Sequence, residues 1–210
     1  EFRRVLFRSL KSYDLVHWEI AAHVFERLDD TPAEQLEGEQ SIYGKGMWAA
    51  SLRYHKDTFY VCFASYDTGK TYIYRTKNIN EPWEKRSLDG VYHHPSLLFD
   101  EDGRIYMGYG FNEVRILELN DTLTAPKEGG FERLLVEEKQ DAYISYEGAH
   151  FYKKDGTYYI FVIQWLKGNL TQREQLCLYG DSLDGEFKKE MVFSENLGFP
   201  MKGVAQDRKS

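Results

Sequence analysis

Three segments of the chain share one pattern, and this repeat constrains the fold more than any other feature of the sequence. The segments are WAASLRYHKDTFYVCFASY from Trp48, HPSLLFDEDGRIYMGYG from His94 and EGAHFYKKDGTYYIFVIQW from Glu147. Each has a short apolar run, a turn rich in Lys, Asp or Gly, and a second run with a tyrosine near its start. A turn of this kind between two apolar runs predicts a β-hairpin.

A third strand-like run and a polar stretch with an aromatic residue follow each hairpin. The third runs are TYIYRTKN (71–78), EVRILELN (113–120) and QLCLYGDS (175–182), and SYDLVHWE (12–19) matches the last part of an earlier, incomplete unit. Units of about 40–50 residues with four short antiparallel strands are typical of β-propeller blades. The sequence therefore predicts an all-β fold, a partial β-propeller with about three complete blades. A β-sandwich is the alternative, but it does not explain the regular recurrence.

The composition indicates a globular chain whose partner is uncharged. Of the 210 residues, 42% are hydrophobic and 16% aromatic, which excludes a disordered chain. The net charge is −7, and no run of Lys and Arg coincides with aromatic residues, so neither a nucleic acid nor a membrane is an expected partner. Cys62 and Cys177 lie in apolar runs, which predicts buried free thiols.

Both ends of the chain read as translated sequencing adapter. The codons GAG TTC AGA CGT GTG CTC TTC CGA TCT encode Glu1 to Ser9, and GAT CGG AAG AGC, which encodes Asp207 to Ser210, is the reverse complement of part of that string. Processing scars are set aside in reasoning about a fold. We therefore expect residues 1–9 and 207–210 to be non-native tails around an incomplete propeller domain at 10–206.

The candidate site residues lie at the starts of the repeated units. The innermost strands of a propeller line a central funnel, so Trp48, His93, His94 and Glu147 are expected to converge there. Burial would raise the pKa of Glu147 toward that of a general acid, and a solvated turn carboxylate is the alternative. Trp48 suits either a sugar-stacking platform or a core aromatic residue.

Further candidates follow the second strand of the last unit. Trp165 and Arg173 are placed to rim the same funnel, although Arg173 also suits a surface charge. The carboxylates of DEDG (100–103) lack the spacing of a calcium loop and predict a hairpin turn. The chain contains no phosphate-binding glycine loop, no Cys/His set with metal-ligand spacing and no nucleophile elbow. The sequence therefore predicts no cofactor and no metal.

Five motifs occur in a specific order along the chain. They are SYDLVHWE, GKGMWAASLRYHKDTFYV, YHHPSLLFDEDGRIYMGYG, YEGAHFYKKDGTYYI and, at the start of a fifth unit, MKGVAQ. Together they resemble glycoside hydrolase family 43, whose members are five-bladed β-propellers that act on arabinose- and xylose-containing polysaccharides. The resemblance covers nearly all of Leu10 to Gln206.

The resemblance implies three acidic residues with separate roles. Glu147 stands at the position of the general acid, in the motif EGxH of blade four. His94 stands where the pattern YHDPSLLFD has the aspartate that orients the acid and tunes its pKa. A carboxylate at that place would raise the pKa of Glu147, whereas a cationic imidazole would lower it. The third acid, an aspartate base of blade one, is expected upstream of Leu10.

The activity that the resemblance implies is inverting hydrolysis of O-glycosidic bonds in plant polysaccharides such as arabinoxylan. The implied enzyme is of the α-L-arabinofuranosidase or β-xylosidase type, and its partner is an oligo- or polysaccharide. Inversion needs a water between the base and the sugar, so the two carboxyl groups lie roughly 6.5–9.5 Å apart. Without its base, this chain is expected to be inactive. The histidine at 94 leaves open a less active or respecialised hydrolase, a non-catalytic sugar-binding propeller and a sequence error.

Overall fold

The computed structural model describes residues 7–25, 28–29, 31–35, 37, 39–137, 142–167 and 173–194. Their strands form one two-stranded and three four-stranded antiparallel sheets. The two-stranded sheet is β1 (Phe7–Lys11) and β2 (Glu19–Phe25). The others are β3 (Ser51–His55), β4 (Thr58–Ser65), β5 (Lys70–Thr76) and β6 (Glu84–Asp89); β7 (Ser96–Phe99), β8 (Ile105–Tyr109), β9 (Glu113–Leu119) and β10 (Glu132–Glu137); and β11 (Ala142–Lys154), β12 (Thr157–Leu166), β13 (Glu174–Gly180) and β14 (Lys188–Phe193).

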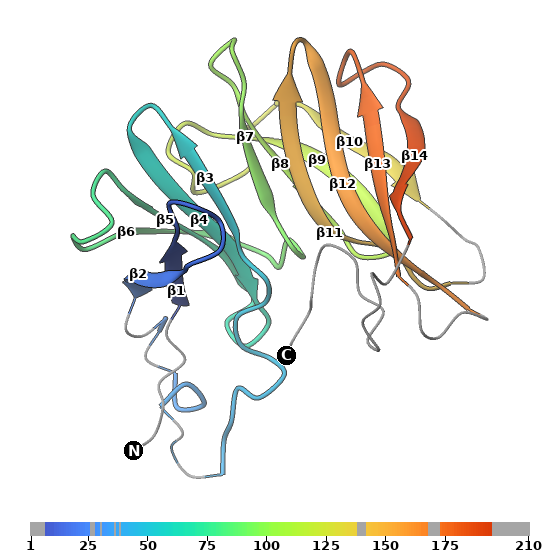
Figure 1. Cartoon of the computed structure of the whole chain (residues 1–210). Helices are drawn as coiled ribbons and strands as arrows, with labels where there is room; N and C mark the ends of the chain where they lie inside the picture. The colour runs from blue at the N-terminus through green and yellow to red at the C-terminus, as the bar shows by residue number, and fades with distance from the viewer. Residues whose placement is uncertain are drawn as a thin grey trace.

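Each four-stranded sheet pairs its strands in chain order, as a propeller blade does. Figure 1 shows β1, β2 and β3–β6 on the left, β7 in the middle and β12–β14 on the right. We call β3–β6, β7–β10 and β11–β14 blades two, three and four. The expected partial propeller with three complete blades is confirmed. The described residues contain no helix long and apolar enough to cross a membrane.

The turns between the first two strands of the blades form as the sequence predicts. Lys56 and Asp57 both have positive φ between the paired residues His55 and Thr58, and Asp155 and Gly156 repeat this between Lys154 and Thr157. Two consecutive positive φ values define the type I′ turn, whose twist matches that of the flanking strands. The turn chemistry therefore sets the register of the innermost strand in two of the blades.

Three apolar cores lie between successive sheets and hold them together. Val24 and Leu28 pack with blade two, and Cys62, Ile73 and Leu88 of blade two pack with blade three. The third core joins blades three and four and includes Tyr106, Ile116, Phe151, Ile160 and Leu178. Cys62 and Cys177 are buried free thiols, as expected, and burial raises the pKa of both thiols.

Arg53 of β3 joins the innermost strands of all three blades. Its guanidinium donates to the carbonyl of Leu97 at 2.9 Å, to Ser96 Oγ at 2.6 Å and to the carbonyl of Phe151 at 3.0 Å. Ser96 belongs to β7 and Phe151 to β11, so β3, β7 and β11 lie close together. The innermost strands of the three blades therefore pack against one another, as those of a propeller do.

Asp100 does more than form the hairpin turn predicted for DEDG. The turn is present, because Gly103 N donates to the carbonyl of Asp100 at 3.1 Å. The buried Asp100 carboxylate also accepts hydrogen bonds from Lys153 Nζ and Tyr158 Oη of blade four, each at 2.6 Å. Burial acts to raise the pKa of Asp100, but these hydrogen bonds outweigh it and hold the pKa below its usual range. Asp100 thus fastens blade three to blade four.

We expect Asp100→Asn to lower the free energy of unfolding by about 2–4 kcal/mol at pH 7, because it removes the buried carboxylate of the Lys153 ion pair and leaves that ammonium only the exposed Glu101, whose Oε2 lies 3.7 Å away. The folded pKa of Asp100 lies below its unfolded value of about 3.9, so this stabilisation is present above that pH and is lost as the pH falls through the folded pKa. Urea unfolding at several pH values measures the difference in unfolding free energy between the native chain and the variant. This difference should become smaller in acid.

The control for this prediction is Asp102→Asn in the same turn. Asp102 pairs with Arg104 at the surface, where its side chain is 42% exposed, so its loss should change stability by less than about 1 kcal/mol. The fastening role of Asp100 would be contradicted if the two variants lost equal free energy of unfolding at pH 7. It would also be contradicted if the difference between the native chain and Asp100→Asn stayed constant in acid.

Some predictions fall at or beyond the edges of the described residues. Arg8 and Ser9, assigned above to a non-native tail, lie in β1 and pair with His23 and Ala22 of β2. The non-native origin of residues 1–9 and 207–210 stays a prediction. The motif MKGVAQ (201–206) lies outside the described residues.

Candidate functional site

Glu147 lies inside a strand rather than ahead of one. β11 begins at Ala142, and its pairing with β12 shifts register on both sides of Glu147, between Ile144 and Glu147 and again between Glu147 and His150. Each shift inserts an extra residue into β11, and Gly148 has a φ of 74°. Bulges re-aim side chains and are frequent beside active sites. Glu147 is only 2% exposed, so the alternative of a solvated turn carboxylate is wrong.

His93 and His94 lie just before β7 and are both buried, at 7% and 3% exposure. Neighbouring side chains of an extended strand point to opposite faces. His94 instead has a φ of 47°, in the left-handed region, and precedes Pro95, which disfavours the right-handed helical conformation. This backbone turn lets both imidazoles face the same way, and their rings stack with centroids 4.0 Å apart.

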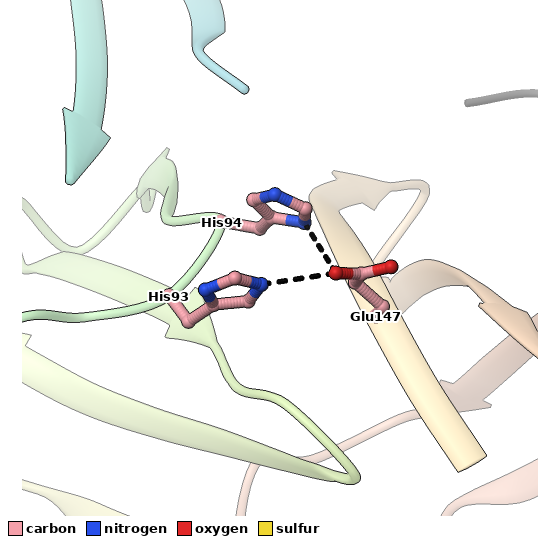
Figure 2. A group of neighbouring side chains, drawn as sticks. All are labelled: His93, His94 and Glu147. Carbon is pink, nitrogen blue, oxygen red and sulfur yellow. Dashed lines mark hydrogen bonds and ion pairs between the residues drawn. The ribbon is translucent and has the colours of Figure 1, made fainter. Parts of the chain in front are cut away.

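Both imidazoles point at one oxygen of Glu147. His93 Nε2 lies 3.0 Å from Glu147 Oε1, within hydrogen-bond distance, and His94 Nδ1 lies 3.9 Å from the same oxygen. Figure 2 shows the carboxylate reaching from β11 toward the two rings at the start of β7. The site therefore joins residues of blades three and four that are far apart in the sequence.

Aromatic residues surround the buried trio that His93, His94 and Glu147 form. The half-buried Trp48 packs against the rings of His93 and His94, with centroids 5.2 and 6.0 Å away. Tyr66 and Phe111, which are 46% and 44% exposed, also contact His93. Tyr66 Oη lies 2.8 Å from His93 Nδ1, so the two nitrogens of His93 connect Tyr66 to Glu147. The buried polar side chains of the trio therefore lie against three partly exposed aromatic residues, Trp48, Tyr66 and Phe111, which we call the aromatic rim.

Asn112 holds the Glu147 segment of β11 against blade three. Its Oδ1 accepts a hydrogen bond from Ser145 N at 2.9 Å, and its own N–H donates to the carbonyl of Tyr146 at 2.8 Å. On the other side, Gly110 N donates to the carbonyl of His93 at 3.0 Å. These hydrogen bonds hold the backbone in place at both His93 and the Glu147 segment.

Trp165 and Arg173 form a separate contact on blade four. The Arg173 guanidinium lies 4.9 Å from the centre of the Trp165 ring, and Tyr143 packs on the same ring at 5.2 Å. Trp165 pairs with Ile144, whereas Glu147 pairs with Ile163, so this contact lies beside the trio along the sheet. The structure therefore shows these two residues in contact with each other, on the sheet that carries Glu147.

Tyr66, Phe111 and Asn112 were not among the residues singled out from the sequence. Tyr66 follows Tyr60 by the same interval at which Trp165 follows Tyr159, so the repeat that indicates Trp165 also indicates Tyr66. The contact between Tyr66 and His93 depends on how blade two meets blade three, which the repeat does not describe. A buried carboxylate with a histidine partner and an aromatic rim suits proton transfer to an uncharged, ring-shaped ligand.

A groove of about 810 Å³ lies elsewhere, on blade four. Its lining residues come from β11, β12 and β13 and include Tyr152, Tyr159 and Phe161. None of its lining residues belongs to the trio or to the aromatic rim. The trio, and not this groove, is the candidate site.

Curated relatives align with most of the length of this chain. A beta-xylosidase of Formosa agariphila is 26% identical over an alignment of 219 positions, gaps included, which covers 94% of this chain and 37% of that protein. A non-reducing end alpha-L-arabinofuranosidase of Bacteroides ovatus is 34% identical over 155 residues, which span 71% of this chain and 28% of that protein. The chain thus spans well under half the length of these relatives.

A solved structure and a family model agree with these relatives. A bifunctional GH43-CE protein of Bacteroides eggerthii superposes with a TM-score of 0.84 at 34% identity, covering 90% of this chain and 25% of that one. The family model for glycosyl hydrolases family 43 matches residues 4–189. The Glu147 site and all strands of the four-stranded blades except most of β14 lie within this match, and the chain belongs to glycosyl hydrolases family 43.

Proposed function

We propose that this protein is part of an inverting glycosidase that releases arabinose or xylose units from plant polysaccharides such as arabinoxylan. One observation carries the proposal: Glu147 is a nearly inaccessible carboxylate that β-bulges aim at His93 and His94, beneath the rim of Trp48, Tyr66 and Phe111. The relatives named a beta-xylosidase and an alpha-L-arabinofuranosidase support the substrate class.

Glu147 acts as the general acid in this scheme. It gives its proton to the glycosidic oxygen as the bond between that oxygen and the anomeric carbon breaks. A water attacks the anomeric carbon from the opposite face and loses a proton to the base, so the anomeric configuration inverts. The imidazoles of His93 and His94 lie on the Oε1 side of the carboxyl group.

The base of this scheme is the aspartate expected upstream of Leu10. We therefore propose that the 210-residue chain binds sugars without turnover, and that a chain with the sequence upstream of Leu10 restored, the extended chain, hydrolyses them. The test follows the first product of the extended chain on aryl β-xylosides and α-arabinofuranosides by NMR. An inverted anomer is expected, and a retained anomer would refute the scheme.

A non-catalytic sugar-binding protein is the second candidate, and the imidazole of His94 favours it. His94 occupies the place of a carboxylate in the family pattern, so the acid lacks its charged neighbour. The same assay separates the two candidates. An extended chain that binds arabinoxylan fragments but shows no hydrolysis would be a binding protein.

Trp48 is expected to be a sugar platform in either case. Its ring is half-buried beside the two histidines, where the apolar face of a pentose can stack on it. We expect Trp48→Ala to weaken binding of arabinoxylan oligosaccharides to the chain about tenfold, or about 1.4 kcal/mol, by calorimetry. Trp18→Ala removes a tryptophan that is 54% exposed on β2's side of the molecule and should leave affinity unchanged. Equal effects of the two changes would exclude the platform.

A further inference from the structure

We propose that His93, His94 and Glu147 form a binding site for a zinc-like divalent cation. The three residues each offer one ligand atom, and these atoms all lie within 4.8 Å of one another. All three side chains are buried and come from two different blades. A search for metal-ligand spacing in the sequence misses the site because Glu147 lies far along the chain from the two histidines.

Two of the three distances between ligand atoms of the trio are close to those that a tetrahedral zinc requires. Zinc bonds to nitrogen and oxygen are about 2.1 Å long, so two ligands of one tetrahedral ion lie about 3.4 Å apart. The observed distances from Glu147 Oε1 are 3.0 Å to His93 Nε2 and 3.9 Å to His94 Nδ1, one shorter and one longer than this value. Both nitrogens can face one ion only after the two rings, which are stacked with centroids 4.0 Å apart and planes 25° from parallel, rotate about their side-chain bonds.

Tyr66 supports His93 as a ligand. Metal-binding histidines usually hydrogen-bond through their second ring nitrogen, which fixes the tautomer and the ring orientation. Tyr66 Oη lies 2.8 Å from His93 Nδ1 and can donate or accept. When Nε2–H donates to Glu147, the tyrosine hydroxyl donates to Nδ1. When a metal takes Nε2, the proton lies on Nδ1 and the hydroxyl accepts it, so both states keep this hydrogen bond.

The donor set selects the kind of metal. Two imidazole nitrogens and one carboxylate oxygen suit zinc, cobalt and nickel, whereas calcium and magnesium prefer sites built from oxygen. Three protein ligands also leave a fourth position on a tetrahedral ion for water or a sugar hydroxyl. The site should therefore bind Zn²⁺ and Co²⁺ and discriminate against Ca²⁺ and Mg²⁺.

Metal binding here is distinct from the proposed hydrolysis and opposes it. A cation on Oε1 replaces the hydrogen bond between His93 and Glu147 and keeps the carboxyl group ionised, so it cannot act as an acid. Zinc should therefore inhibit the extended chain reversibly if that chain is a glycosidase. Binding of the metal to the 210-residue chain does not depend on whether the proposed function is right.

The experiment titrates the untagged, chelator-treated chain with Zn²⁺ by calorimetry and with Co²⁺ by visible absorption. We expect one ion per chain and an intense tetrahedral cobalt spectrum, with no comparable binding of Ca²⁺ or Mg²⁺. His94→Asn and His93→Gln should each weaken zinc binding at least about tenfold, and Tyr66→Phe should weaken it by about tenfold. His150→Gln, a change on the same strand as Glu147, should have no effect.

Particular outcomes would overturn the proposal. They are the absence of stoichiometric zinc binding, an affinity that His94→Asn leaves unchanged, or Ca²⁺ binding as tight as Zn²⁺ binding. Circular dichroism of each variant checks that it is folded. If His93→Gln fails to fold, His94→Asn decides the matter, because asparagine tolerates the left-handed backbone at this position.

Discussion

We expect the replacement of Glu147 with Gln to lower kcat/KM of the extended chain on xylo- and arabino-oligosaccharides by roughly 10²–10⁴-fold, the usual contribution of a general acid. The loss depends on the leaving group. Dinitrophenolate leaves without protonation, so the variant should approach the native rate on dinitrophenyl glycosides. Steady-state rates on a series of aryl glycosides with leaving groups of different pKa measure this dependence.

Glu118→Gln is the matched control for that change. Glu118 is also a buried carboxylate, 5% exposed, but it pairs with Lys127 and accepts a hydrogen bond from Phe131 N, away from the trio. Its loss should reduce stability and leave the leaving-group dependence as it is in the native chain. A Glu147→Gln variant equally slow on all leaving groups would show that Glu147 supports the structure and does not donate the proton.

Replacing His94 with Asp should raise kcat of the extended chain about tenfold or more, measured with a chelator present to remove metal ions. Nδ1 of His94 lies 3.9 Å from Glu147 Oε1, and a carboxylate at that range favours the protonated form of its neighbour. The change also introduces the aspartate that we expect at this place from the resemblance to the family.

His94→Asn separates the charge of the new residue from its size. Asn and Asp have nearly the same shape and both tolerate a left-handed backbone, so only the carboxylate distinguishes them. We expect the Asn variant to stay near the native rate. If Asp and Asn give the same rate, or if the native chain is already as fast as the Asp variant, the three-acid scheme does not describe this protein.

The repeat predicted the blades well because neighbouring strands of a blade pair with each other and are close together in the sequence. Hairpins such as the one at Lys56 and Asp57 follow from turn residues and alternating apolar residues, which are adjacent in the sequence. The length of β11 was not predictable in the same way. Its first residues pair with the far end of β12, and the bulges around Glu147 reflect that long-range pairing.

The site was partly predictable for a related reason. The expected convergence of strand starts brings Trp48, His93, His94 and Glu147 together, because innermost strands share the funnel. Contacts between blades escaped prediction. The hydrogen bonds of Asp100 to Lys153 and of Tyr66 to His93 join residues whose proximity depends on the angle between sheets, which no local pattern encodes.

The left-handed backbone at His94 bears on how such a site can change over generations. Histidine and aspartate codons differ by a single base, and both residues are among the few that accept a φ near 47° without a glycine. One nucleotide substitution therefore exchanges an imidazole for a carboxylate here while the chain path into β7 stays the same. The backbone at this position therefore accommodates either residue, and a lineage can exchange them in either direction without a change of chain path.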